Sequence, residues 1–350
     1  MRLFTCQHCG QLLYFENVRC EKCGYRLGYL PSAMALTALD ELGDSFRPLA
    51  DPAAQVRFCE NAGHDACNWL IDAKSSRRFC EACRHNHIIP DLSDPANKLR
   101  WQKIEAAKHH LFYSLLRLGL NIKDRRQDPE HGLAFDFLAD PPQAPKVMTG
   151  HDNGLITIAL AEADDAERER RRTEFHEPYR SLLGHFRHEI GHYAWDLLIR
   201  NAGRLDACRA VFGDDTRDYS EALQTYYHQG APVDWQDQFI SPYASSHPWE
   251  DWAETWAHYL HIVDTLEMAW SFGLRIHPRA GRDETLIAVV DVDPYVCKSM
   301  QTIIDCWLPL IFAMNSLNRA MGHADLYPFV LSPAVIGKLS FIHETVNMGR

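Results

Sequence analysis

The stretch HFRHEIGHYAWDLL, residues 185–198, decides how the whole chain is interpreted. Its apolar residues recur every three or four positions, which predicts a buried helix between residues 178 and 200. His188 and His192 are four residues apart, so both imidazoles lie one turn apart on one face and can bind the same ion. Glu189 is rotated by about 100° and can act on a water molecule at that ion without binding the ion. This helix is therefore a candidate zinc site.

A second helix is expected after Pro248, in the stretch PWEDWAETWAHYLHIV. Glu250 and Glu254 lie one turn apart on the same face of this helix. Two histidines leave a zinc ion short of one protein ligand, so Glu250 is the candidate third ligand. Glu254 is then placed to accept a proton from a ligand histidine and to fix its orientation. The alternative is that both glutamates are solvated side chains on the surface of the helix.

The chain has eleven cysteines, and eight of them lie before residue 84 in two groups of four. The first group consists of Cys6, Cys9, Cys20 and Cys23. Its two Cys-x-x-Cys-Gly turns can present four thiolates to one structural zinc ion, because the glycines permit the tight turn. The alternative for these pairs is a redox or iron–sulfur site. The metal is expected to stabilise this segment, which is too short to bury a core of its own.

The second group is more loosely spaced and consists of Cys59, Cys67, Cys80 and Cys83. It also matches a closed four-thiolate zinc site. The nearby histidines His64, His85 and His87 are either alternative ligands or solvated loop residues. With the histidine site, the two groups predict three zinc ions in the chain, one catalytic and two structural.

The net charge of −11 argues against nucleic acid as a partner. Residues 1–100, which hold the cysteine groups, contain 12 basic and 12 acidic residues, whereas binding to phosphates requires an excess of basic charge. No stretch approaches the roughly 18 apolar residues of a membrane span, and no apolar signal region precedes Cys6. We therefore expect a cytoplasmic protein that does not bind membranes.

The pattern of secondary structure predicts an α+β fold. A helix is expected from Asp94 to Gly119, a strand over residues 133–140, and a turn at Asp152–Gly154 before the strand LITIALA. The charged run 163–174 is a solvated helix or loop. The expected domains are a zinc ribbon (1–30), a linker (31–52) with a second zinc module (to 93), and a mostly helical catalytic domain with a small antiparallel sheet (94–350).

The pairing of HEIGH with a later Glu-x-x-Ala-Glu helix resembles the glutamate-type zincins. The spacing from Tyr243 to Glu250 and Glu254 resembles the peptidase domain of anthrax lethal factor. Over most of its length the chain is similar to bacterial zinc-binding metallopeptidases with an N-terminal zinc ribbon. The resemblance implies His188, His192 and Glu250 as ligands.

It also implies Glu189 as general base and Tyr243 as hydroxyl donor to the oxyanion. The implied reaction is hydrolysis of a polypeptide, which would pair with LITIALA as the edge strand of a zincin-like sheet. The zinc ribbons could then hold a protein partner. The alternative is a zinc-ribbon protein-binding module that carries a regulatory or inactive metallopeptidase-like domain.

Overall fold

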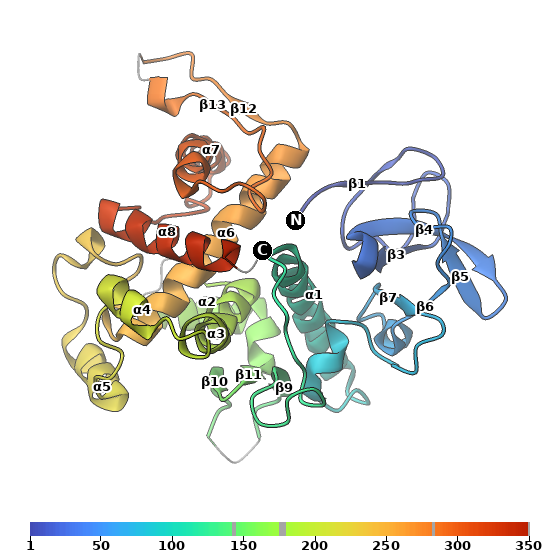
Figure 1. Cartoon of the computed structure of the whole chain (residues 1–350), viewed down its shortest axis with the longest axis horizontal. Helices are drawn as coiled ribbons and strands as arrows, with labels where there is room; N and C mark the ends of the chain where they lie inside the picture. The colour runs from blue at the N-terminus through green and yellow to red at the C-terminus, as the bar shows by residue number, and fades with distance from the viewer. Residues whose placement is uncertain (142–144, 175–179, 282–283, 349–350) are drawn as a thin grey trace. The chain divides into compact units, whose positions relative to one another are not determined.

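The computed structural model describes residues 1–141, 145–174, 180–281 and 284–348. The chain forms two compact units, the first made of Met1–Leu116 and Asn121–Arg168 and the second of Arg117–Leu120 and Glu169–Arg350. Figure 1 shows the helices and strands of the two units, with labels on the larger elements. Among the described residues, no helix is both long enough and apolar enough to cross a membrane.

The first unit begins with the cysteine-rich region. The strands β1 (Phe4–Thr5) and β2 (Leu12–Leu13) form a small antiparallel hairpin. An antiparallel sheet follows, with the strands β3 (Leu27–Leu30), β4 (Ala35–Leu42), β5 (Ser45–Pro48), β6 (Val56–Phe58) and β7 (Leu70–Asp72) in sequential order. Its core is formed by Leu30, Leu39, Val56 and Leu70. The five-stranded sheet thus begins after the first cysteine group in the chain and includes the strands that flank Cys59 and Cys67.

This sheet corrects the expected boundary after residue 30 and the expected linker. β3 belongs to the first cysteine segment, yet it pairs with β4 over four residues. The stretch 31–52 was expected to be a connection, but it contains β4 and β5. Strand pairing satisfies the backbone polar groups of this stretch and buries Leu36, Ala38 and Leu39. The strand after the first cysteine group and the strands on either side of Cys59 and Cys67 therefore belong to one sheet.

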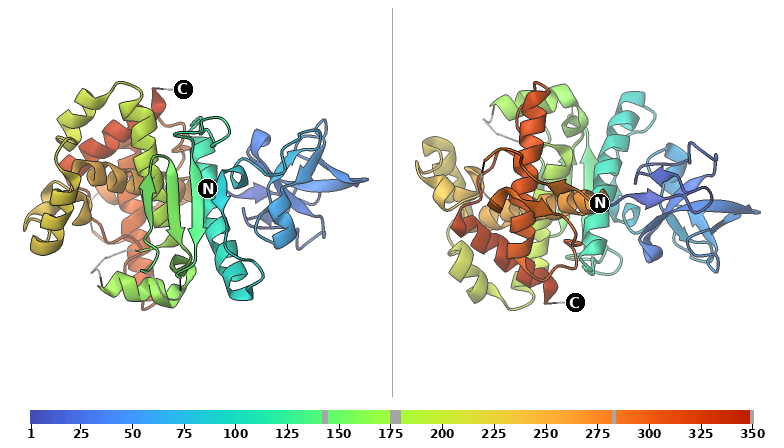
Figure 2. Two further views of the ribbon diagram at one scale, coloured as in Figure 1. Left: turned by 90° about the horizontal axis from the view of Figure 1, so that it is seen from below. Right: turned by 90° about the horizontal axis from the view of Figure 1, so that it is seen from above.

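The rest of the first unit is a long helix with a second sheet. Helix α1 (Pro95–Arg117) begins where it was predicted, with the Asp94 carboxylate accepting from the N–H of Ala96 at 2.8 Å. The second sheet has the order β10 (Gly150–Asp152), β11 (Leu155–Ala159), β9 (Ala134–Leu138) and β8 (Asn86–Ile88). Its strands lie side by side in the left view of Figure 2.

Two expectations about this second sheet were wrong. The sheet is mixed, because β11 and β8 both run parallel to β9, and only β10 and β11 form an antiparallel hairpin. β11, the strand expected at the edge, is paired on both sides, so β10 occupies that edge among the described residues. β8 precedes residue 93 and β9 follows it, so segments on both sides of the expected boundary contribute strands to this sheet.

The second unit is mostly helical. Its helices are α3 (Leu182–Trp195), α4 (Leu205–Phe212), α5 (Tyr219–Gln229), α6 (Pro248–Ser271), α7 (Met300–Ala320) and α8 (Pro333–Asn347). A π-helical turn (Asp196–Arg200) follows α3. The strands β12 (Arg275–Ile276) and β13 (Ala288–Val289) form a short antiparallel hairpin. The charged run 163–174 forms helix α2 (Asp165–Glu174), which includes residues of both units. The N-terminal end of the helix expected over residues 178–200 lies outside the described residues.

Helix α6 is the centre of this unit. It contacts α3, α4, α7 and α8. Trp252, Trp256 and Leu260, which were expected to supply bulk for packing, have no exposed surface. The chain has a cysteine-rich N-terminal region followed by a mostly helical unit, with small sheets in both. The α+β class is therefore confirmed.

Candidate metal centres

The helices α3 and α6 approach each other closely at one point, which places the candidate ligands. A Cβ atom added to Gly191 would lie 2.9 Å from the Cα atom of Ala253, so only glycine fits at this crossing. The indole of Trp252 donates to the backbone oxygen of Gly191 at 2.9 Å. Gly191 lies between Glu189 and His192 in the chain, and Ala253 lies between Glu250 and Glu254. The close contact therefore brings the two motifs face to face.

Both helices have capped N-termini near the site. The Ser181 hydroxyl accepts from the N–H of Gly184 at the start of α3. The His247 side chain accepts from the N–H of Trp249 at 3.1 Å, and Pro248 occupies the first turn of α6. The caps fix where each helix begins and hence which residues face the neighbouring helix.

The donor atoms of His188, His192 and Glu250 converge on one point. The Glu250 Oε2 atom lies 3.1 Å from His188 Nε2 and 3.6 Å from His192 Nε2, and all three donor atoms lie within 4.8 Å of one another. Two ligand atoms bound to one tetrahedral zinc ion at about 2.05 Å are about 3.3 Å apart. The donor set and its spacing therefore fit a zinc ion with three protein ligands.

Burial and charge at this cluster also suit a cation. Glu250 and His192 are 1% and 3% exposed, so their polar atoms have little access to solvent. Burial opposes ionisation of Glu250, but the two imidazoles hold its pKa well below its ordinary value. Burial likewise opposes protonation of His188, but Glu250 and Glu254 raise the pKa of His188 well above its ordinary value. A buried carboxylate that stays ionised between two imidazoles is the donor set expected around a metal ion.

Glu254 lies against the far side of His188. Its Oε1 atom is 2.7 Å from His188 Nδ1, and its other oxygen accepts a hydrogen bond from the Ser241 hydroxyl at 2.6 Å. This contact fixes the orientation of the imidazole and leaves Nε2 directed at Glu250. The structure thus separates the two glutamates, with Glu250 among the donor atoms and Glu254 behind them.

Tyr243 lies beside the same cluster, and Glu189 directly follows the ligand candidate His188 in α3. Glu189 is 8% exposed. Tyr243 lies in a 3-10 turn, Tyr243–Ser245, with its ring centroid 6.0 Å from that of His188. Burial, aided by the charge of Glu250, raises the pKa of Tyr243, so its hydroxyl keeps its proton at neutral pH. Of the two residues that the resemblance implied, Tyr243 therefore lies near the donor atoms, and Glu189 is a buried neighbour of His188 in the chain.

Tyr219, the first residue of α5, is a site residue that the sequence did not indicate. Its hydroxyl donates to the Oε1 atom of Glu250 at 2.6 Å. Burial, together with the charges of Glu250 and Glu189, raises its pKa. Tyr219 precedes Glu250 by 31 residues, and no spacing rule connects a tyrosine at that distance to a ligand.

The first cysteine group also has the spacing of a metal site. Cys6, Cys9, Cys20 and Cys23 place their sulfur atoms within 4.8 Å of one another. The sulfurs of Cys6 and Cys23 are 3.7 Å apart, and those of Cys9 and Cys20 are 3.6 Å apart. Two sulfurs bound to one zinc ion are about 3.8 Å apart. The glycine after each pair has a positive φ, 74° at Gly10 and 78° at Gly24, as expected for the two tight turns.

The second cysteine group converges in the same way. Cys59, Cys67, Cys80 and Cys83 lie within 4.8 Å of one another, and the sulfurs of Cys67 and Cys80 are 3.8 Å apart. Backbone N–H groups donate to three of the sulfurs, at 3.3 to 3.4 Å, as is common for thiolates that bind metal. The donor set fits a zinc ion.

The sequence suggested His64, His85 and His87 as alternative ligands. The structure shows no bond from any of these three histidines to the four sulfurs. His85 bonds to the Leu133 carbonyl, and burial lowers its pKa to about 4. His87 bonds to Asp136, and His64 packs near Trp101. The histidine at the cluster is instead His109 of α1, whose Nε2 atom lies 3.2 Å from the Cys67 sulfur.

A signal for His109 was present in the sequence. Glu105, Lys108 and His109 share the face of α1 that carries Trp101 and Phe112, and all five are buried. Charged residues in phase with the apolar stripe of a helix indicate a buried polar partner, because burial of an unpaired charge is costly.

Comparison with known proteins assigns both parts of the chain. Residues 3–94 match a zinc-ribbon domain family. Proteins described as uncharacterized from Mycobacterium bovis and from two strains of Mycobacterium tuberculosis are each 44% identical over 348 residues, which cover 99% of this chain and 96% of theirs. No solved structure matches the chain. Residues 97–345, which hold the histidine–glutamate cluster, match the family described as "Putative zinc-binding metallo-peptidase", and the chain belongs to this family.

Proposed function

We propose that the protein is a cytoplasmic zinc-dependent endopeptidase of the glutamate-type zincin class. The observation that carries the proposal is the convergence of His188, His192 and Glu250 at ligand spacing. Three protein ligands leave a fourth position of a tetrahedral ion open, which is typical of catalytic rather than structural zinc. Eight further cysteine thiols at ligand spacing favour a reducing compartment.

His188, His192 and Glu250 would hold the ion, and Glu254 and Tyr219 would hold these ligands in place. A zinc ion bound there supplies Lewis acidity, which activates water and polarises the carbonyl of the peptide bond to be cleaved. The structure fits this arrangement because two of the three ligands are each bonded to a neighbour that fixes their orientation, His188 to Glu254 and Glu250 to Tyr219.

Glu189 would act as the general base. Its carboxylate accepts a proton from the attacking water and passes it to the departing amine nitrogen. Tyr243 would donate a hydrogen bond to the oxygen that becomes negative as the carbonyl carbon turns tetrahedral. The raised pKa of Tyr243 supports this role, since only the protonated hydroxyl can donate.

The two cysteine groups would each hold a structural zinc ion, which gives three zinc ions per chain. The catalytic ion would exchange more readily, because its site keeps an open position whereas four thiolates enclose an ion. A polypeptide is the substrate that this family assignment favours, and the zinc ribbons are candidates for a protein-binding surface.

Selective removal of the exchangeable ion tests the proposal. We expect mild chelation to remove one of three zinc ions and to abolish hydrolysis of peptides, while far-ultraviolet circular dichroism stays unchanged. Addition of zinc should restore the hydrolysis. If the fully loaded protein cleaves no peptide in a broad library, the alternative of a protein-binding module with an inactive metallopeptidase-like domain is favoured instead.

A further inference from the structure

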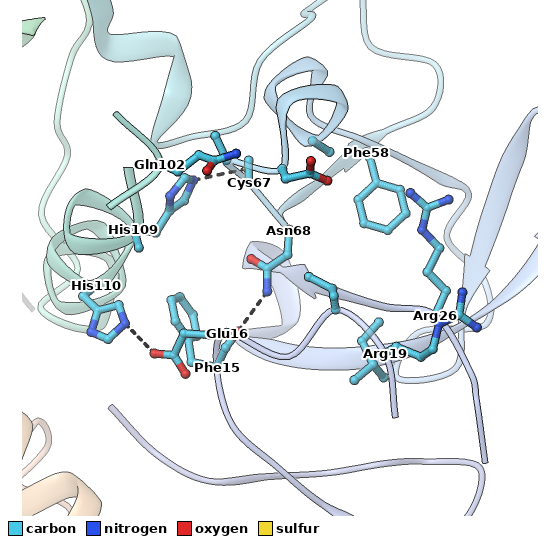
Figure 3. A pocket seen from close by; sticks show the side chains of 16 residues that line it. Phe15, Glu16, Arg19, Arg26, Phe58, Cys67, Asn68, Gln102, His109 and His110 are labelled. Atoms are coloured by element: carbon cyan, nitrogen blue, oxygen red, sulfur yellow. Dashed lines mark hydrogen bonds and ion pairs between the residues drawn. The ribbon is translucent and has the colours of Figure 1, made fainter. Parts of the chain in front are cut away.

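The second cysteine group borders a pocket of about 560 Å³ in the first unit. Phe15 and Arg26 of the first cysteine segment, Phe58 and Cys67 of the second, and Gln102 and His109 of α1 contribute to its lining. Figure 3 shows Cys67 and His109 beside each other at one end of this pocket. The cluster is therefore not enclosed on the side of these two residues.

Hydrogen bonding fixes the tautomer of His109. Its Nδ1 atom lies 2.6 Å from the backbone oxygen of Glu105, one turn earlier in α1. A carbonyl oxygen can only accept, so Nδ1 carries the proton and neutral His109 presents the lone pair of Nε2 to the cluster. Thiolates that bind a metal ion have no proton to donate to this lone pair. A metal ion can accept electron pairs both from the Nε2 atom of His109 and from the thiolates.

The position of His109 Nε2 is that of a metal ligand. It lies 3.2 Å from the Cys67 sulfur, 3.5 Å from the Cys83 sulfur and 4.0 Å from the Cys80 sulfur. A nitrogen and a sulfur bound to one tetrahedral zinc ion are about 3.5 Å apart. The three distances scatter around this value, so His109 could complete a site with three of the four thiolates.

The carboxylate of Glu105 is a weaker candidate for this position. Its Oε1 atom accepts hydrogen bonds from the fully buried Lys108, at 2.8 Å, and from Asn86, at 2.6 Å. Its Oε2 atom lies 3.5 Å from the Cys83 sulfur, and the donor atoms of Cys83, Glu105 and His109 lie within 4.8 Å of one another. Glu105 is thus committed to its own ion pair, and His109 is the fifth donor of the cluster.

Cys67 differs from the other three cysteines. Cys59, Cys80 and Cys83 are each 1% exposed, whereas Cys67 is half-buried and lines the pocket. It is also the cysteine whose sulfur lies closest to His109 Nε2. A zinc ion takes four ligands, so one of five donors is in excess, and Cys67 is the thiolate that solvent in the pocket can reach.

We propose that His109 and Cys67 are interchangeable ligands of the second metal centre, which makes Cys67 a thiol that can be modified without loss of the metal. In the exchange one metal–sulfur bond breaks and one metal–nitrogen bond forms. The released thiolate faces the pocket, where it takes a proton from water or reacts with an electrophile. The inference rests on the assignment of a zinc ion to this cluster and not on peptidase activity.

Zinc content of the full-length variants tests the exchange. We expect C67A and H109A to retain the wild-type number of zinc ions and C67A/H109A to lose one ion, as C80A/H109A, which also leaves three donors, should do. The matched control is C67A/H110A, because His110 neighbours His109 on α1 but bonds to Glu16, and we expect it to retain all ions. If folded C67A or folded H109A alone lacks one ion, the two ligands are not interchangeable and the proposal is wrong.

Alkylation of the wild-type protein gives a second measurement that requires no substitution. Iodoacetamide forms a carbon–sulfur bond with a thiolate and releases iodide. We expect mass spectrometry to find Cys67 modified before the other seven cysteines of the two groups, with zinc content unchanged. Loss of one zinc ion in step with modification of Cys67 would overturn the proposal, because His109 would then have failed to replace the sulfur.

Discussion

Substitution of Gly191 by alanine tests whether the contact between α3 and α6 places the metal ligands. The added Cβ atom would lie 2.9 Å from Ala253 Cα and 3.2 Å from its carbonyl oxygen. Carbon atoms in contact are normally about 3.5 to 4.0 Å apart, so the helices would have to separate by roughly 0.6 Å or more. Both contacts are backbone atoms of α6, and no side-chain rotation can relieve them.

Two opposing effects determine how much G191A changes the free energy of unfolding. Overpacking of this kind costs about 1 to 3 kcal/mol, whereas alanine gains about 1 kcal/mol over glycine inside a helix. We therefore expect the free energy of unfolding to fall by up to about 2 kcal/mol. The effect on zinc should be larger, because Glu250 moves away from His192 with α6, and metal sites tolerate displacements of only about 0.5 Å. We expect zinc affinity to fall at least about tenfold.

Gly337 provides a matched control. It lies within α8, and a Cβ atom there would meet nothing within 4 Å. G337A should raise the free energy of unfolding by about 1 kcal/mol and leave zinc affinity unchanged. Denaturant titration and chelator competition on both variants provide the comparison. Equal stabilisation of G191A and G337A, with wild-type zinc affinity in both, would refute the reasoning.

Three further predictions concern neighbouring residues. E250A should lose the exchangeable zinc ion, whereas E254A should keep it with roughly 10- to 100-fold weaker affinity, as chelator competition would show. Y219F removes the hydrogen bond to Glu250 and should weaken zinc binding about tenfold, whereas Y227F, at an exposed tyrosine, should not. Burial lowers the pKa of His258 from 6.5 to about 4, so its protonation favours the unfolded chain. The free energy of unfolding should fall as the pH drops from about 6.5 to 4, and H258Q should show a smaller fall in denaturant titrations at each pH.

Local sequence patterns predicted the helices that carry the site. The apolar periodicity around HEIGH and the proline before Glu250 correspond to α3 and α6, because helix formation depends on neighbouring residues. The Asn153–Gly154 turn likewise forms the expected hairpin, with both residues at positive φ. These features need no information about distant parts of the chain.

Features that depend on tertiary contacts could not be predicted in this way. The parallel pairing of β8 with β9 joins segments about 50 residues apart, and no turn signal connects them. Tyr219 and His109 reach their clusters only through the packing of α5 and α1. Ala253 is the alanine of the Glu-x-x-Ala-Glu motif, but its role as the surface against which Gly191 packs becomes evident only in the structure.

The most direct test of the account is the cleavage of a proteome-derived peptide library by zinc-loaded wild-type protein and by E189Q. The substitution leaves all proposed ligands in place, so zinc content and fold should be equal in the two proteins. We expect the wild type to produce internal cleavages and E189Q to produce them about 10²- to 10⁴-fold more slowly, the contribution typical of a general base. Equal cleavage by both proteins, at equal zinc content, would contradict the proposed mechanism.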